Sequence, residues 1–376
     1  MLFRSVGMNV TGVKLFKKDH TFDAPFPISA NLTKDTPAAI MFTGGTTKAP
    51  KGVVLSHGNF MRGTYNGVFA VGSAFNQRYL NLMPFTHVFG LIRCALTSLY
   101  TGSSLYCCIN PKDLVQDLMI SRPTYLILVP ALAEMLYGLS KMLGKEKIIP
   151  DLRVIIAGGA PVHPKLTIKY HEIGISLMGG YGLTESACLV SGNRVGILMP
   201  EKVASVGMTF PNQSVKTDKN GTLLISGDHV MLGYYNDQNA TNAVLKDGWF
   251  NTGDLGRIDD DGFLFVAGRS DNLIVFESGE KVTPEEIESE IENIPYVKDS
   301  IVKPIRNESG MTVLEAEIFP NDAVVKAMGI ANLQEVAIYD INKINEKNPS
   351  YMRIVRVSIR KEDFKRSASM KIMRGQ

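Results

Sequence analysis

The residues that could do chemistry begin with a polar loop at residues 42–52, which reads Phe-Thr-Gly-Gly-Thr-Thr-Lys-Ala-Pro-Lys-Gly and follows an apolar run at 38–42. Glycines expose backbone N–H groups, threonines add hydroxyl donors, and Lys48 and Lys51 add positive charge, so the loop suits phosphate oxygens. Clusters of Gly, Thr and Pro also form ordinary surface turns. The loop is not a Walker P-loop, because Lys51 is followed by Gly52 rather than by Ser or Thr.

Three further stretches combine glycine turns with polar side chains. Glu185 follows the turn Gly-Tyr-Gly-Leu-Thr at residues 180–184, and its carboxylate suits Mg²⁺, which prefers oxygen ligands. Residues 158–160, Gly-Gly-Ala, end an apolar run without bulky side chains, so a flat ligand could approach the backbone there. Asp254 closes a Thr-Gly-Asp turn and suits two ribose hydroxyls. Simple glycine and Asx turns explain the same residues, so both interpretations stay open.

Two cationic or titratable candidates remain. His87 lies in Pro-Phe-Thr-His-Val-Phe-Gly, residues 84–90, and a histidine among aromatic residues is more often a packed core residue than a ligand. Lys371 lies in a basic stretch at residues 366–374, and such stretches are usually solvated.

Composition describes an ordinary globular protein of 376 residues, 45% hydrophobic and 20% charged, long enough for two or three domains. A formal net charge of +3 gives no reason to expect a nucleic-acid partner. The four cysteines have neither metal-ligand spacing nor the density of a disulfide framework, which fits a reducing cytoplasmic location. Cys107 and Cys108 are expected on a buried strand. We expect no signal peptide and no transmembrane segment, and peripheral membrane contact stays open.

Short apolar runs alternate with helical stretches from residue 37 to about residue 210. The runs at 78–83, 124–129 and 152–157 are nearly continuous, which is typical of buried parallel strands in an α/β sheet. Each run ends beside a candidate motif, as expected if a ligand binds at the carboxyl ends of the strands.

The pattern then changes twice. Residues 203–270 hold short strands with Asn-Gly and Asp-Gly turns, which predicts a β-rich subdomain. Beyond Asp271 the sequence predicts a capping box at Thr283, an amphipathic helix over 333–344 and a strand over 352–359, forming an α+β unit. We therefore expect a large domain at residues 1–270 and a small C-terminal domain at residues 271–376.

Taken in order, these stretches resemble the motifs of the adenylate-forming (AMP-binding) superfamily, which includes acyl-CoA synthetases, nonribosomal adenylation domains and luciferases. The seven matching segments are 42–52, 84–90, 157–161, 180–185, 249–254, 268–271 and 366–374. The resemblance spans residues 37–374. It implies a large α/β domain with mostly parallel sheets and a β-rich subdomain, followed by a mobile α+β domain.

The resemblance also implies site residues. ATP-binding positions would be Thr43, Gly44, Gly45, Thr46, Thr47 and Lys51 at the phosphates, Gly158, Gly159, Ala160, Gly180, Tyr181 and Gly182 along the adenine, and Asp254 and Arg269 at the ribose. Catalytic positions would be Thr184 at the phosphate, Glu185 at Mg²⁺, His87 in the carboxylate pocket and Lys371 between carboxylate and α-phosphate. Asp271 would be the hinge, and Ser278, Gly279 and Glu280 the loop on the CoA side.

The chain departs from the superfamily pattern at three residues and in its length. Lys48 stands where the family has glycine, Met370 replaces the glycine before Lys371, and Thr222 replaces the usual glutamate after Gly221. Far fewer residues precede the loop than in family members, so part of the first subdomain is expected to be missing. Either the chain is a fragment, or its sheet has an exposed edge that invites aggregation or a partner.

The resemblance implies an ATP-dependent carboxylate–CoA ligase, with ATP, Mg²⁺ and CoA as its small-molecule partners. Gly44 resembles the form seen in long-chain fatty acyl-CoA ligases, so a fatty acid would be activated to acyl-adenylate and transferred to CoA. Two alternatives stay open: an aryl-CoA or acyl-carrier-protein ligase, and a non-catalytic nucleotide-binding remnant or partner module. The sequence indicates neither the acid nor the oligomeric state.

Overall fold

The computed structural model of the chain describes residues 31–43, 50–69, 75–108, 110–366 and 372–374, and every structural statement below refers to these residues. The chain divides into a unit at 1–33, of which only 31–33 are described, and a unit at 34–376 that holds every element named here.

The candidate phosphate loop joins two antiparallel strands, β1 (Pro37–Phe42) and β2 (Gly52–Ser56). A third short strand, β12 (Gly233–Tyr234), pairs with the other edge of β2. Helix α1 (His57–Phe69) follows β2 directly, as the sequence predicts. Asn59 anchors the start of α1, because its amide donates to the carbonyls of Asp228 and Val230 at 2.8 and 2.9 Å.

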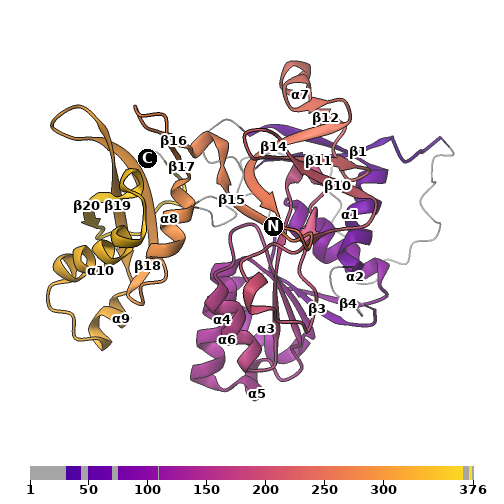
Figure 1. Cartoon of the computed structure of the whole chain (residues 1–376). Coiled ribbons are helices and arrows are strands. Elements are labelled where there is room, and N and C mark those ends of the chain that lie inside the picture. The colour runs from indigo at the N-terminus through magenta and orange to yellow at the C-terminus, as the bar shows by residue number, and fades with distance from the viewer. Residues whose placement is uncertain (1–30, 44–49, 70–74, 109, 367–371, 375–376) are drawn as a thin grey trace, which may run out of the picture. The chain divides into compact units, whose positions relative to one another are not determined.

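A seven-stranded sheet forms the centre of the large α/β part (Figure 1). Its order is β4 (Ser104–Cys107), β3 (Arg78–Asn81), β5 (Tyr125–Leu128), β6 (Val154–Ala157), β7 (Ser176–Tyr181), β8 (Ser191–Gly192) and β9 (Met208–Thr209). The first five strands are parallel, and the last two pair antiparallel. The predicted parallel strands are therefore confirmed, and their carboxyl ends lie at one edge of the sheet.

Residues of the central strands alternate between two cores, as the two-residue period of a strand requires. Tyr125 and Ile127 of β5 pack in one core, whereas Leu126 and Leu128 pack in the other. The second core is covered by α3 (Leu114–Ser121), α4 (Pro130–Leu143), α5 (Lys145–Ile148) and α6 (Pro164–Glu172). The first core receives the π-helix η2 (Phe89–Leu96), which runs into α2 (Thr97–Tyr100).

The β-rich subdomain predicted from its turns is a five-stranded antiparallel sheet. It contains β10 (Gln213–Thr217), β11 (Thr222–Gly227), β13 (Leu245–Lys246), β14 (Trp249–Ile258) and β15 (Leu264–Arg269), with α7 (Gln238–Val244) before β13.

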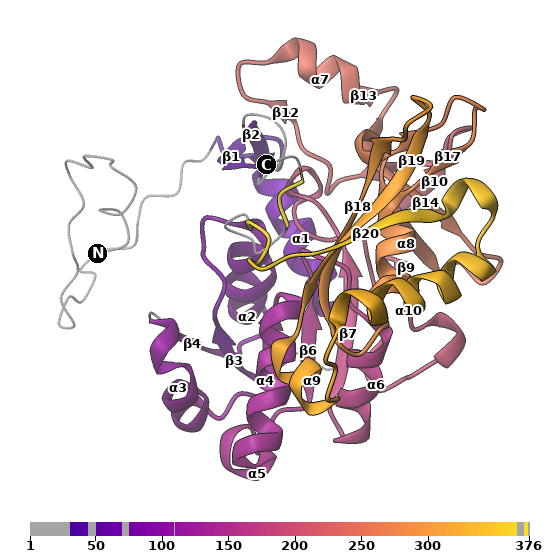
Figure 2. The ribbon, with the colours of Figure 1, turned by 90° about the vertical axis from the view of Figure 1, so that its left-hand side faces the viewer.

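The C-terminal α+β part has a three-stranded sheet and its own apolar core, drawn from residues 274–359. Its elements are the hairpin β16 (Ile274–Val275) and β17 (Lys281–Val282), α8 (Pro284–Ile291), β18 (Val297–Arg306), β19 (Thr312–Pro320), α9 (Asp322–Ala327), α10 (Leu333–Lys347) and β20 (Ile354–Ile359). Helix α8 packs beside β18 and α10 beside β20 (Figure 2). The division at Asp271 stays a prediction.

Two local predictions are wrong. Cys107 ends the edge strand β4 and is exposed, and Cys108 follows it half-buried, because β4 has no neighbour beyond it in the sheet. Thr283 precedes α8, but its side chain makes no capping hydrogen bond. None of the described helices combines the length and apolarity needed to cross a bilayer.

Candidate active site

The two ends of the phosphate loop are tied together. The Thr43 N–H donates to the Lys51 carbonyl at 3.0 Å, and the Lys51 N–H donates to Thr43 Oγ1 at 3.1 Å. The hairpin therefore holds the two ends of the loop, Thr43 and Lys51, side by side. The predicted phosphate contacts of Gly44, Gly45, Thr46 and Thr47, and the departure at Lys48, lie outside the described residues.

Glu185 lies beside the end of this loop. It belongs to a 3-10 turn, η4 (Thr184–Ser186), just beyond β7. Tyr234 of β12 donates from its hydroxyl to Glu185 Oε1 at 2.9 Å, and the ammonium of Lys51 lies 4.5 Å from the centre of the Tyr234 ring. The Met231 N–H also donates to the Glu185 carbonyl at 2.8 Å. One tyrosine thus connects the candidate metal ligand to the candidate phosphate loop.

The backbone around Glu185 is tightly constrained. A Cβ on Gly182 would lie 1.6 Å from the Cys188 carbonyl oxygen, so only glycine fits there. Ala187 and Cys188 have φ values of +46° and +90°, a region that side-chain-bearing residues adopt at a cost. Ser186 Oγ accepts from the Leu183 N–H at 2.9 Å and closes the turn. This strain holds Glu185 at the end of β7, as strain often does at functional sites.

A second polar group lies at the start of the segment 181–185, whose last residue is Glu185. It consists of Tyr181, Asp254 and Arg269. The Tyr181 hydroxyl donates to Asp254 Oδ2 at 2.6 Å, and Arg269 Nη1 donates to Asp254 Oδ1 at 2.8 Å. Asp254 and Arg269 face each other across β14 and β15, and Thr252 Oγ1 accepts from the Asp254 N–H at 3.0 Å. Burial, and then the Asp254 charge, raise the pKa of Tyr181 well above its usual value. Tyr181 therefore stays a neutral donor.

Phe89 and His87 lie where β3 and β6 end. A Cβ on Gly158 would lie 3.1 Å from the Phe89 ring, so the Gly158–Gly159 turn is in close contact with the first residue of η2. His87 precedes this helix, and its Nδ1 accepts from the Phe89 N–H at 3.2 Å. The neutral His87 side chain would then carry its proton on Nε2.

The remaining predicted positions belong to the C-terminal part. Asp271 lies in the turn η6 (Ser270–Asn272), where Ser270 Oγ donates to the Gly253 carbonyl at 2.9 Å. Ser278 and Gly279, both exposed, and the half-buried Glu280 form the tip of the β16–β17 hairpin, and Gly279 has a φ of +94°. Lys371 lies outside the described residues.

The structure brings Lys51 and Glu185 to the same tyrosine, Tyr234, and it joins Tyr181 to Asp254 and Arg269. Gly158 follows β6, the strand that pairs with β7. Sequence reasoning missed Tyr234, Thr252 and Phe89. Phe89 stood inside the histidine motif, and Thr252 inside the Thr-Gly-Asp turn, so both could have been named. Tyr234 carries no comparable signal, because a two-residue strand has no recognisable pattern.

Mg²⁺ fits this donor set. Among the described residues there is no group of three or more His, Cys, Asp or Glu that could hold a metal. Mg²⁺ beside nucleotide phosphates needs only one or two carboxylates, with phosphate oxygens and water completing its shell. Glu185 supplies one carboxylate of this kind beside the loop.

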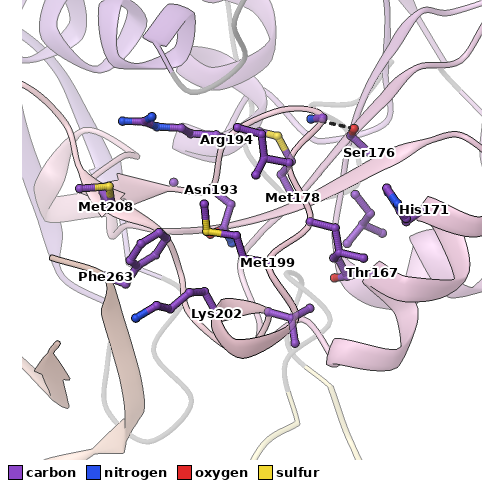
Figure 3. Close-up of a pocket in the computed structure, with 16 residues that line it drawn as sticks. Thr167, His171, Ser176, Met178, Asn193, Arg194, Met199, Lys202, Met208 and Phe263 are labelled. Carbon is purple, nitrogen blue, oxygen red and sulfur yellow. Dashed lines mark hydrogen bonds between the residues drawn. The ribbon is translucent and has the colours of Figure 1, made fainter. Parts of the chain in front are cut away.

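A separate cavity of about 180 Å³ lies at the other end of β7. Thr167 and His171 reach it from α6, Met178 from β7, and Met199 and Phe263 from loops (Figure 3). None of the predicted site residues lines it. It is therefore distinct from the candidate active site.

Comparison with protein families decides the assignment of the chain. The profile described as "AMP-binding enzyme" matches residues 8–235, more than half of the sequence. The chain belongs to the AMP-binding enzyme family. The profile described as "AMP-binding enzyme C-terminal domain" matches residues 271–376 of this family member.

Known proteins similar to this AMP-binding enzyme are CoA ligases. An indoleacetate–CoA ligase of Aromatoleum aromaticum is 32% identical, over 78% of this chain and 59% of its own length. A probable CoA ligase of Humulus lupulus is 29% identical, over 89% of this chain and 62% of its own length. The o-succinylbenzoate coenzyme A synthetase of Bacillus subtilis, in complex with ATP and a magnesium ion, superposes with a TM-score of 0.76 at 25% identity, over 91% of this chain and 70% of that chain.

The chain spans about 60% of the length of the two curated relatives just named. The superposition agrees with the fold expected from the sequence, a large α/β part with a β-rich subdomain and a small α+β part.

Proposed function

We propose that this protein uses ATP and Mg²⁺ to activate a carboxylic acid as its acyl-adenylate and then transfers the acyl group to CoA. The observation that carries the proposal is the position of the segment 181–185. Its first residue, Tyr181, donates to Asp254, which also pairs with Arg269. Its last residue, Glu185, accepts from Tyr234, whose ring lies beside the Lys51 ammonium. A ribose site and a phosphate–metal site at the two ends of one short segment suit a single ATP molecule.

In this proposal each group has one task. The Asp254 carboxylate accepts hydrogen bonds from the ribose hydroxyls, with Arg269 beside it. Lys51, Thr184 and the loop at 43–51 bind phosphate oxygens. Glu185 would hold Mg²⁺, which neutralises phosphate charge so that a carboxylate can approach.

The acid and the acceptor have their own residues in the proposal. His87 and Phe89 border the acid, and Lys371 would contact the carboxylate and the α-phosphate during transfer. The segment around Asp271 would then allow the C-terminal part to turn, so that Ser278, Gly279 and Glu280 approach CoA.

We propose an aromatic acid in place of the fatty acid expected from Gly44. The relatives support this choice, because their names specify indoleacetate, ferulate, coumarate and succinylbenzoate as acids. An aromatic ring also suits the flat surface that Phe89 and Gly158 border, since Gly158 has no side chain.

The test is acid-dependent exchange of labelled pyrophosphate into ATP, with a panel of aromatic and fatty acids. We expect exchange with aromatic acids at least tenfold faster than with fatty acids of equal carbon number. Lys371→Ala should abolish most exchange without weakening ATP binding measured by calorimetry, whereas Lys361→Ala, an exposed control, should change neither. ATP binding without exchange for any acid would instead support a nucleotide-binding module without turnover.

A further inference from the structure

One buried side chain near the proposed acid site has no carboxylate hydrogen-bonded to it among the described residues. Arg93 of η2 is 0% exposed, and all three of its guanidinium nitrogens lack a hydrogen-bond partner among the described residues. No described carboxylate hydrogen-bonds to it, and its charge acts on the neighbouring Tyr79 hydroxyl, which is a neutral group. Arginine cannot shed its proton as a buried lysine does. Within the described part of the chain, a permanent charge is therefore buried without a hydrogen-bonded carboxylate.

The groups around Arg93 cannot neutralise it. Burial raises the pKa values of the Cys94 and Cys188 thiols to about 12, although the Arg93 charge opposes this. Burial likewise raises the pKa values of Tyr79 and Tyr125, and the Arg93 charge opposes both shifts. All four side chains are neutral at physiological pH, so the positive charge is surrounded by uncharged groups.

A glycine on the neighbouring helix α1 leaves space for the Arg93 side chain. Helix α1 packs against η2 and α2. A Cβ on Gly67 of α1 would lie 3.2 Å from Arg93 Nη1 and 2.6 Å from Thr97 Oγ1. Asn66 Oδ1, in the same region, is also buried and unpaired among the described residues. The Tyr79 hydroxyl is buried next to Arg93, whose charge opposes the rise of its pKa. Buried polar groups are normally paired, so a cluster of unpaired ones needs an explanation.

The position of Arg93 relates it to the proposed acid site. Phe89, four residues earlier in the same helix, contacts Gly158, and His87 lies just before the helix. Cys188 follows Glu185 by three residues and interacts with Arg93. Arg93 follows His87 by six positions, which corresponds to at most about 9 Å along a helix axis. The helix is a π-helix over eight residues, Phe89–Leu96, and π-helical turns are frequent at functional sites.

We propose that Arg93 binds a second carboxylate of the acid substrate, so that the protein selects a dicarboxylic acid. One carboxylate of the substrate would lie near His87 and be activated. The Arg93 guanidinium would bind the other carboxylate through two parallel hydrogen bonds. The side chains of Phe89, Tyr79 and Tyr125 would surround the part of the substrate that lies between its two carboxylates. This inference rests on the proposed function for the identity of the site, and it adds the substrate class.

The test compares matched acids on the full chain: terephthalate against benzoate, and glutarate against valerate. Calorimetry measures binding of each acid, and pyrophosphate exchange measures its activation. We expect the wild type to bind each dicarboxylate about ten- to a hundredfold more tightly than its monocarboxylate partner, since a charged hydrogen-bonded pair contributes that much. Arg93→Met should remove this preference, and Arg93→Lys should restore part of it. Arg153→Met, at an exposed arginine before β6, is the control and should keep the preference.

The outcomes separate the two proposals. Exchange that is equal for dicarboxylates and monocarboxylates would overturn the role of Arg93 and leave the proposed function standing. Dicarboxylate binding that depends on Arg93, without exchange for any acid, would support the arginine site and contradict the ligase activity. If Arg93→Met does not fold, the binding measurements on the wild type still test the proposal, because equal affinity for a dicarboxylate and its matched monocarboxylate would contradict the role of Arg93.

Discussion

The Tyr181 hydroxyl donates a hydrogen bond of 2.6 Å to Asp254, 73 residues further along the chain. Both side chains are buried, at 8% and 6% exposure. Asp254 also accepts from Arg269, so its two oxygens have different partners. The parallel sheet and the β-rich subdomain are therefore joined at the proposed ribose site.

Replacing Asp254 should weaken nucleotide binding. Asp254→Asn removes the charge that faces Arg269 and the proposed ribose hydroxyls, so the Kd for ATP should rise about ten- to a hundredfold. Tyr181→Phe removes one neutral hydrogen bond, so the Kd should rise by less than about tenfold. Calorimetric titration with ATP measures both. Asp260→Asn, in an exposed turn, is the control, and an equal effect there would contradict the assignment.

Tyr234 should tune the dependence on Mg²⁺. Its hydroxyl donates to Glu185 Oε1 at 2.9 Å and orients the carboxylate that would hold the metal. Tyr234→Phe should raise the Mg²⁺ concentration needed for half-maximal exchange several-fold and leave ATP binding in EDTA unchanged. Tyr235→Phe, at a residue 57% exposed, should alter neither quantity. Identical Mg²⁺ dependence in both variants would rule out a role for Tyr234 at the metal.

The strained turn beyond β7 should tolerate no side chain at Gly182. In Gly182→Ala the new Cβ would overlap the Cys188 carbonyl, which is backbone and cannot rotate away. We expect a loss of roughly 3 kcal/mol or more, seen as a lower Tm. Gly138→Ala is the matched control within α4, where an added Cβ meets no atom within 4 Å. That change should stabilise the helix by about 0.5–1 kcal/mol.

Much of the fold follows from local sequence. The runs at 124–129 and 152–157 become buried parallel strands because nearly every residue in them is apolar. Their carboxyl ends carry the motifs, so the position of the site could be predicted from where these runs stop.

Other features depend on pairing across long stretches of chain. The link from Tyr234 to Glu185 requires β12 to pair with β2, about 180 residues earlier in the chain. The exposure of Cys107 depends on β4 being an edge strand, which an apolar pattern does not reveal. The unpaired state of Arg93 likewise appears only once α1, η2 and β3 are packed together.

His229 gives the stability of the large α/β part a defined dependence on pH. It is 0% exposed, and neither ring nitrogen is paired among the described residues. Burial, and then the nearby Arg62 charge, lower its pKa to about 4, whereas an unfolded histidine titrates near about 6.5. Below pH 6.5 the unfolded chain therefore binds a proton that the folded chain excludes. The stabilising effect of keeping His229 neutral is complete above pH 6.5 and is lost as the pH falls toward 4.

Replacing His229 by a residue that does not titrate should remove this acid sensitivity. In His229→Leu the difference in Tm between pH 8 and pH 5 should shrink, because up to about 2 kcal/mol of proton-linked destabilisation at pH 5 disappears. The gain should be larger at pH 5 than at pH 8. Thermal unfolding at several pH values measures it, with His171→Leu as the control at an exposed histidine of α6. A shift of the same size at both pH values would mean that packing, and not titration of His229, is responsible.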